Sequence, residues 1–434
     1  MKTQMFHKIQ KVNKILFFIV AINLSGSIYA STVLTKSAQP DTLNFVQYRG
    51  SVIDSDSKNP LVFATISVNA TNIATISNSE GVFLLKVPKN LINAKVTVSY
   101  IGYKSRQFTL SDFHPENNRI ELEIQNVKLN PITIFPTDPE LLMRAVMNKK
   151  GQNYFKDPTL MTAFYREAIK KRRNYVSLSE AVVEIVKQPY LSPRDDYAQI
   201  YKGRKSTDYN KLDTLVFKLQ GGPYTNLMLD IMKNPELIFT EDMIGNYQFT
   251  LNDITKINDR LTYIIRFRQW PHLKNPLYYG EIYVDTETLA LTGALFDLNV
   301  ADRDAAGQMF LKKKPVGARV YPTSAEYRID YREKDGRWYF GYSRGQITFK
   351  VIWNKKLFNT VYESTIEMLV TDWEKLAVNP INPAERLRPT VIMVDEISGF
   401  ADPQFWGEYN VIEPEKSIES AIKKIQKSLE KKNK

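Results

Sequence analysis

The stretch from Gly50 to Tyr103 constrains the fold of this chain more than any other part of it. Short runs in which apolar and polar residues alternate, such as Thr65–Val68, are separated by turn residues such as those at 54–60. Gly81 follows Asn-Ser-Glu and can take the positive φ that a tight hairpin requires. Turn signals about every 8–12 residues are typical of an all-β sandwich. The sequence therefore predicts a small β-sandwich over residues 46–125.

Four motifs in this stretch resemble one family. They are G-x-V-x-D from Gly50, P-L-x-x-A-T-I-x-V from Pro60, E-G-x-F-x-L-x-V-P from Glu80 and V-x-V-S-Y-I-G-Y from Val96. Together they resemble the carboxypeptidase-regulatory-like domain, a prealbumin-like module common in exported proteins of Bacteroidetes-type bacteria, often ahead of outer-membrane transporters. The resemblance covers residues 46–125 and implies a domain that has no catalytic residues of its own.

The first 30 residues have the three parts of a secretory signal peptide. Lys8, Lys11 and Lys14 precede an apolar run at 15–22, and small residues follow up to Ala30. The apolar run is shorter than the ~20 residues that a membrane-spanning helix needs. We therefore expect a signal peptide at 1–30 and a polar linker at 31–45.

The chain contains no cysteine. This excludes disulfides, thiolate metal sites and cysteine nucleophiles, and it excludes lipid attachment to a cysteine after the signal. An exported chain without thiols suits an oxidising compartment. We expect a protein in the periplasm or associated with the outer membrane, and not a lipoprotein.

The net charge of +12 is concentrated at the two ends of the chain. The leader carries +4 and the last twenty residues carry another +4, which leaves a mildly basic remainder. Nucleic-acid binding requires a concentrated basic face. The sequence therefore predicts no nucleic-acid partner.

A linker at 126–138 leads into a larger body at 139–410. Asp138-Pro139-Glu140 is typical of a helix start. Between 247 and 371, strand patterns with short turns predict an antiparallel meander. Residues 188–222 are predicted as a long loop or a weak strand pair, and residues 300–322 as a long loop. The predicted fold class is mainly β: a prealbumin-like sandwich plus a larger, half-barrel-like antiparallel domain with a few helices.

The body resembles, in pattern more than in motif, exported lipoprotein-carrier folds. In these a curved antiparallel sheet wraps one or two helices, and the nearest local likeness is the hairpin from Tyr279 to Ala294. Such folds hold acyl chains on their concave face, so the resemblance implies an apolar, lipid-like ligand. It assigns no ligand residue.

The C-terminal segment 411–434 is predicted to form a basic amphipathic helix. Ile418, Ile422, Ile425 and Leu429 recur at helical spacing between lysines. One interpretation is peripheral contact with an anionic membrane surface. The other is a terminal helix that docks on the body and ends in a lysine-rich tail.

No catalytic, cofactor-binding or metal-binding residues are assigned. His114 and His272 are the only histidines after the leader, and they lie in unrelated settings, whereas a zinc peptidase needs two histidines and an acid. The pairs Asp54/Asp56 and Asp302/Asp304 lack the glycine and distal glutamate of a calcium loop.

Three hypotheses follow. The first is a non-enzymatic cell-envelope protein that binds or assembles a partner, with a lipid-like ligand in the body or an envelope protein as the partner. The second is a carbohydrate-binding accessory protein of an outer-membrane uptake system, which uses exposed aromatic residues. The third is a hydrolase that uses carboxylates. The oligomeric state is left open.

Overall fold

The computed structural model describes residues 44–125, 138–207, 218–311, 317–354, 358–377, 380–397, 405–415, 418–420 and 422. The predicted signal peptide, the Lys312–Lys314 run and most of the predicted C-terminal helix lie outside these residues. In the described part, no helix is both long enough and apolar enough to cross a membrane.

The N-terminal part is a β-sandwich, as predicted. One sheet has the order β4-β1-β7 and the other the order β3-β2-β5-β6. Its strands are β1 (Phe45–Asp54), β2 (Thr65–Val68), β3 (Ala74–Ile76), β4 (Val82–Pro88), β5 (Lys95–Ser99), β6 (Arg106–Thr109) and β7 (Asn118–Leu122), with 3-10 turns η1 (Lys89–Leu91) and η2 (Leu110–Asp112). Ile66 and Val68 point into the core between the sheets, as their alternation predicts.

The body is built on one antiparallel sheet of ten strands that does not close into a barrel. Its strand order is β10-β9-β8-β17-β16-β15-β14-β13-β12-β11. The strands are β8 (Thr159–Lys171), β9 (Asn174–Lys187), β10 (Tyr197–Thr207), β11 (Tyr247–Ile257), β12 (Arg260–Gln269), β13 (Tyr278–Asp285), β14 (Leu291–Leu298), β15 (Ala318–Lys334), β16 (Arg337–Trp353) and β17 (Thr360–Lys375). The predicted meander runs from β11 to β17, and β8 pairs with β17 to extend it. The mainly β fold class is confirmed.

The two faces of the large sheet differ in character. We call the face that carries Ile265, Ile282 and Ile329 the inner face, because these side chains join the main hydrophobic core. Arg266 and Glu281, which alternate with them along β12 and β13, lie on the outer face. Period-two alternation thus separates an apolar face from a polar face.

Short helices cover the inner face. Buried side chains of α2, α4, α6 and α7 belong to the same core as the inner face of the sheet. The helical elements of the body are α2 (Pro139–Asn148), α3 (Lys150–Asn153), α4 (Pro223–Met228), η4 (Pro235–Leu237), α5 (Glu241–Ile244), α6 (Arg303–Phe310), η5 (Pro383–Glu385) and α7 (Met393–Glu396). The predicted helix start is correct, since the Asp138 carboxylate accepts hydrogen bonds from the Glu140 and Leu141 amides.

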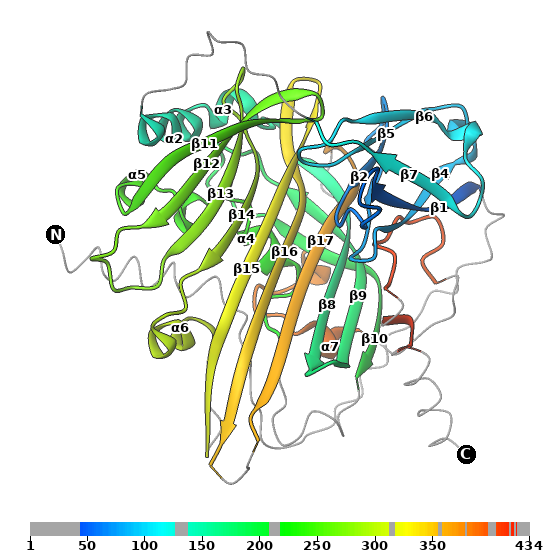
Figure 1. Cartoon of the computed structure of the whole chain (residues 1–434). Helices are drawn as coiled ribbons and strands as arrows, with labels where there is room; N and C mark the ends of the chain where they lie inside the picture. Colours follow the sequence, from blue (N-terminus) through cyan, green and yellow to red (C-terminus); the bar gives the residue numbers. More distant parts are fainter. Residues whose placement is uncertain are drawn as a thin grey trace, which may run out of the picture.

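The sandwich lies against the outer face of the sheet beside β17 and β8 (Figure 1). Residues 405–415, which we call the C-terminal strap, are packed between the two. Trp406 and Ile412 of the strap share one hydrophobic cluster with Leu84 of the sandwich and with Phe164 of β8. The aromatic residues at 405–409 thus pack on the body, and the strap also contacts the sandwich.

Several local predictions are corrected by the structure. Part of the segment 188–222 forms β10, which is an edge strand. Its outer face carries the charged residues Lys202 and Arg204, so the strand does not show the usual alternation of apolar and polar residues. The segment 300–322 contains α6, which starts at the side chain of Asp302. Residues 338–343 and 346–353 belong to one strand, β16, which has a register shift opposite the step from Asp330 to Tyr331.

Candidate functional site

The histidines and paired aspartates of the sequence have local roles. The Asp54 carboxylate accepts hydrogen bonds from the Ser57 amide and the Tyr103 hydroxyl, and these lower its pKa to about 2. The Asp302 carboxylate caps α6. The ring of His272 lies beside the ring of Trp270, 6.3 Å between centroids. No three His, Asp or Glu side chains in the described ranges are grouped so that they could hold a metal ion.

Residues 170–173, which are all lysine or arginine, form the tip of the β8–β9 hairpin. Arg172 has a φ of +56° in the turn. The Lys170 ammonium lies 3.1 Å from the Glu363 carboxylate on β17. The run therefore forms the hairpin turn and an ion pair with the neighbouring strand β17.

A buried ion cluster joins the strap to the outer face. The Arg166 guanidinium contacts the carboxylates of Glu180, at 2.7 Å, and Glu367, at 3.0 Å. Its third nitrogen donates to the Ile412 carbonyl of the strap at 2.7 Å. The Arg204 guanidinium pairs with the other oxygen of Glu180. Every charge in this cluster has a partner, so it stabilises the junction and leaves no group free for a ligand.

A second buried ion cluster lies where β9 and β10 meet the turn after α4. The Lys187 ammonium lies 2.5 Å from Asp196 and 2.8 Å from Asp230. Asp230 also accepts a hydrogen bond from the Tyr331 hydroxyl at 2.8 Å. Each charge of this cluster has an oppositely charged partner, and the cluster ties three segments of the body together.

Glu167 is the acidic group on the inner face whose titration is most altered. Burial raises its pKa to about 7, although a hydrogen bond from the Tyr165 hydroxyl, 2.8 Å long, favours the charged form. A carboxyl group with such a pKa is a candidate acid or base. Glu167 does not line the hollow on the outer face of β11–β15.

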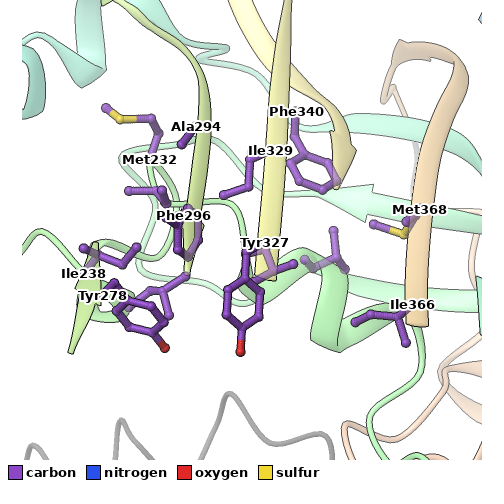
Figure 2. Packing of buried hydrophobic residues seen from close by; sticks show 14 of the residues in the cluster. Met232, Ile238, Tyr278, Ala294, Phe296, Tyr327, Ile329, Phe340, Ile366 and Met368 are labelled. Atoms are coloured by element: carbon purple, nitrogen blue, oxygen red, sulfur yellow. The ribbon is translucent and has the colours of Figure 1, made fainter. Parts of the chain in front are cut away.

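The inner face itself is filled by side chains. Met232 and Ile238, from the segment after α4, pack against Ala294, Phe296 and Tyr278 of the sheet (Figure 2). A lipid on this face would have to displace these side chains. The apolar surface that could hold the predicted lipid-like ligand is therefore already covered by the protein's own side chains.

The outer face of β11–β15 has a broad, shallow hollow instead. Its volume is about 990 Å³, and it opens to solvent. Each strand contributes three of its lining residues: Gln248, Thr250, Asn252, Arg266, Phe267, Arg268, Tyr279, Gly280, Glu281, Leu295, Phe296, Asp297, Ser324, Glu326 and Tyr327. Gly280 lies between Phe267 and Phe296 in the register, where a Cβ atom would come within 2.2 Å of the Leu295 carbonyl oxygen. We call this surface the outer hollow.

The charged groups of the outer hollow fall into two sets. Arg266 pairs with Glu281 at 2.8 Å, and Arg268 donates to the Gln248 side chain at 3.0 Å. Asp297 and Glu326 face one another across β14 and β15, and neither has an ion pair within the described ranges. Burial, and then the charge of Glu326, raises the pKa of Asp297. The hollow thus contains two carboxylates whose charge is not neutralised by any basic side chain in the described part of the chain.

Large apolar side chains are exposed beside these polar groups. Tyr279 is 44% exposed and Leu295 is 36% exposed, and both line the hollow. Trp270, which follows the last residue of β12, is 38% exposed. A mixture of exposed aromatic rings, carboxylates, amides and guanidinium groups can bind a ligand that has both hydroxyl groups and apolar faces.

Sequence reasoning missed this site, because its residues are dispersed. They extend from 248 to 327, three on each of five strands, and no short motif contains more than three of them. The available signal was the period-two alternation of each strand. It places Arg266, Glu281, Leu295 and Glu326 at outward-facing positions of consecutive antiparallel strands. Only the strand register brings them together.

Comparison with known proteins supports the sequence prediction for the N-terminal domain. Residues 48–134 match the family model of the CarboxypepD_reg-like domain, which confirms the predicted resemblance. No curated protein matches the chain at a significant level.

Solved structures share a general likeness with the chain. One is a domain from Vibrio parahaemolyticus assigned to outer membrane lipoprotein sorting, with 9% identity, a TM-score of 0.27, and coverage of 57% of this chain and 96% of that one. Another is a DUF1329 family protein from Desulfovibrio piger, with 12% identity, a TM-score of 0.22, and coverage of 56% and 96%. A third is lipovitellin, with 9% identity, a TM-score of 0.25, and coverage of 53% and 27%. At these TM-scores the likeness carries no argument about ligands.

Proposed function

We propose that this protein is an exported, non-enzymatic binding protein of the cell envelope and that the outer hollow is its ligand-binding surface. The location is inferred from the leader sequence and from the cysteine-free composition. The observation that carries the binding role is the outer hollow itself, a polar depression on a sheet face that the rest of the described chain leaves open. Ligand sites in proteins are generally concave and of a few hundred to about 1,000 Å³.

The covered and uncovered halves of the outer face support this choice. Over β8, β9, β16 and β17 the outer face is covered by the sandwich and the strap, and its buried charges have partners. Over β11–β15 the same face has exposed apolar side chains and unpaired carboxylates. Apolar side chains gathered on one exposed surface mark binding sites, and like charges directly opposite one another destabilise an isolated sheet, so a bound partner at this surface accounts for both.

A lipid carrier is the second candidate, and the apolar inner face favours it. The side chains shown in Figure 2 belong to one hydrophobic cluster, which includes residues of the sheet and of the segment after α4. In this alternative, that segment moves away to admit an acyl chain. The two candidates place the ligand on opposite faces of the same strands.

Native mass spectrometry of the mature protein, purified from an envelope fraction, tests the proposal. Wild type is compared with Leu295→Arg, which places a bulky charge in the outer hollow, and with Leu261→Arg. Leu261 is an exposed leucine at the start of β12 that does not line the hollow, so it is a matched control. We expect a bound mass in wild type and in Leu261→Arg, and its loss in Leu295→Arg. A lipid mass that persists in all three proteins, or no bound mass in wild type, would refute the proposal.

Product analysis tests whether the protein acts without catalysis. Asp297 and Glu326 are two carboxylates on one surface, and paired carboxylates are also the catalytic groups of glycosidases. We expect oligosaccharides incubated with the protein to be recovered intact by chromatography. Cleavage that is lost in Asp297→Asn would replace the binding role with the hydrolase hypothesis.

A further inference from the structure

We infer that the ligand of the outer hollow is a neutral oligosaccharide, which lies across β12–β15 with a sugar ring on Tyr279 and hydroxyl groups on Asp297 and Glu326. This inference rests on the proposed function and names the ligand class of the same surface. It follows from the hydrogen-bonding groups, the exposed apolar side chains and the charge of the hollow.

The two carboxylates of the outer hollow can bind a ligand that supplies hydrogen-bond donors. An ionised carboxylate is an acceptor only, with two oxygens that can accept from several donors at once. Asp297 and Glu326 are directly opposite one another in the antiparallel register, so their acceptor atoms face the same volume. Adjacent hydroxyl groups of a sugar supply pairs of donors with no charge. Hydrogen bonds from them to a carboxylate are stronger than those between neutral groups.

The exposed apolar residues of the outer hollow favour a ligand with an apolar face. Tyr279 is next to Asp297 in the β13–β14 register, and Leu295 is opposite Glu281 in the same pairing. Both side chains are exposed to solvent. A sugar ring has one face made of C–H groups and an edge of hydroxyls. It can therefore cover an aromatic ring and reach the flanking carboxylate at the same time.

The charges disfavour other ligand classes. The Arg266 and Arg268 side chains are already hydrogen-bonded to Glu281 and Gln248, so an anionic ligand would meet the uncompensated carboxylates before any free cation. An acyl chain would bury Asp297 and Glu326 without hydrogen bonds, which is costly for charged groups. A cationic peptide remains compatible with two carboxylates, and the experiment below distinguishes it from a sugar.

The arrangement also costs the folded protein stability, as expected for residues retained for binding. Like charges directly opposite one another on antiparallel strands are destabilising. A residue that lowers stability and increases ligand affinity is characteristic of a functional surface. Asp297→Asn should accordingly raise stability while it weakens binding, and a purely structural role would not produce that combination.

The inference is tested by calorimetric titration of the full mature chain with cellohexaose, xylohexaose, mannohexaose, maltohexaose and an oligolysine peptide. We expect one or more hexasaccharides to bind, and Tyr279→Ala and Asp297→Asn each to weaken binding by about tenfold. Tyr279→Phe keeps the ring and should bind within about threefold of wild type. Phe358→Ala removes an exposed aromatic side chain that does not line the hollow, and it should bind as wild type. Circular dichroism checks that each variant is folded.

Three outcomes would overturn the inference: no hexasaccharide binds, hexasaccharides bind Tyr279→Ala and Asp297→Asn as tightly as wild type, or oligolysine binds in their place. These outcomes are separable from failure of the proposed function. If no sugar binds, and the native bound mass is still lost in Leu295→Arg, the hollow is the binding surface and only the ligand class is wrong.

Discussion

Asp297 on β14 and Glu326 on β15 lie directly opposite each other on the outer face, and no basic side chain in the described ranges pairs with either. The relationship is unusual, because cross-strand partners on an exposed sheet face ordinarily stabilise it. Burial and the charge of Glu326 both raise the pKa of Asp297, so its charged form is less favourable in the folded protein than in the unfolded chain.

Asp297→Asn should therefore stabilise the protein at neutral pH. Because the folded pKa of Asp297 is raised, its favourable contribution is present at low pH and is lost as the pH rises through that pKa. Removal of the charge should raise the free energy of unfolding by about 0.5 kcal/mol at pH 7 and have little effect near pH 3. Urea unfolding at both pH values measures this. A lower stability of Asp297→Asn at pH 7 would show that the carboxylate has a stabilising partner.

Lys187→Met should strongly destabilise the body. The change would leave the carboxylates of Asp196 and Asp230 close together and buried, without the ammonium that lies between them. Loss of one member of a buried ion pair costs about 3–5 kcal/mol. Lys170→Met is the control, because its partner Glu363 is more exposed, and it should cost less than about 1 kcal/mol. Equal losses in urea unfolding would contradict the account.

Glu167 should make stability depend on pH between about 4.5 and 7. Its pKa is 4.5 in a free side chain and about 7 in the fold, so the folded state retains a proton that the unfolded chain loses. The free energy of unfolding should fall as the pH rises through this window, by up to about 3 kcal/mol. Glu167→Gln should flatten this slope and be more stable than wild type at pH 8. Glu363→Gln, at a more exposed position, should keep the wild-type slope; a wild-type slope in Glu167→Gln would refute the assignment.

Trp406→Ala should loosen the sandwich from the body. The Trp406 ring packs edge-on against Phe164, with centroids 5.5 Å apart, and lies 4.9 Å from the Arg204 guanidinium. Truncation of a buried tryptophan costs about 3–5 kcal/mol. We expect faster hydrogen exchange in β3 and β4, which face the strap, and no change in β12. Trp270→Ala, at an exposed position, should leave exchange in β3 and β4 unchanged; equal protection in the two variants would show that the strap does not fasten the sandwich.

The sandwich could be predicted from the sequence because the patterns that specify its strands and turns each lie within a few consecutive residues. Alternation at 65–68 and the turn at Gly81 each specify a strand or a hairpin within a few residues. The meander of the body was predicted for the same reason. The alternation along its strands also separates the inner face from the outer face, since the successive residues Ile265 and Arg266 point to opposite faces.

Other features depend on contacts between distant residues and were not predicted. Lys202 and Arg204 hide the alternation of β10, because their partners lie on another strand or on the strap. The outer hollow exists only through the register of five strands, and the strap joins the sandwich through residues more than 300 positions away in sequence, as Asn410 does with Lys86. A single sequence does not contain such pairings in any local pattern.

The neighbours Tyr278 and Tyr279 allow the most direct test of the outer hollow. Tyr278 is buried in the inner-face core and Tyr279 is exposed in the hollow, so the two rings report on opposite faces. We would place 3-fluorotyrosine at one position at a time and record fluorine NMR spectra during titration with the neutral hexasaccharides and then with an envelope lipid extract. We predict a saturable shift at Tyr279 with a hexasaccharide and none at Tyr278. A shift at Tyr278 with the lipid extract, with Tyr279 unchanged under both titrations, would contradict the account and place the ligand on the inner face.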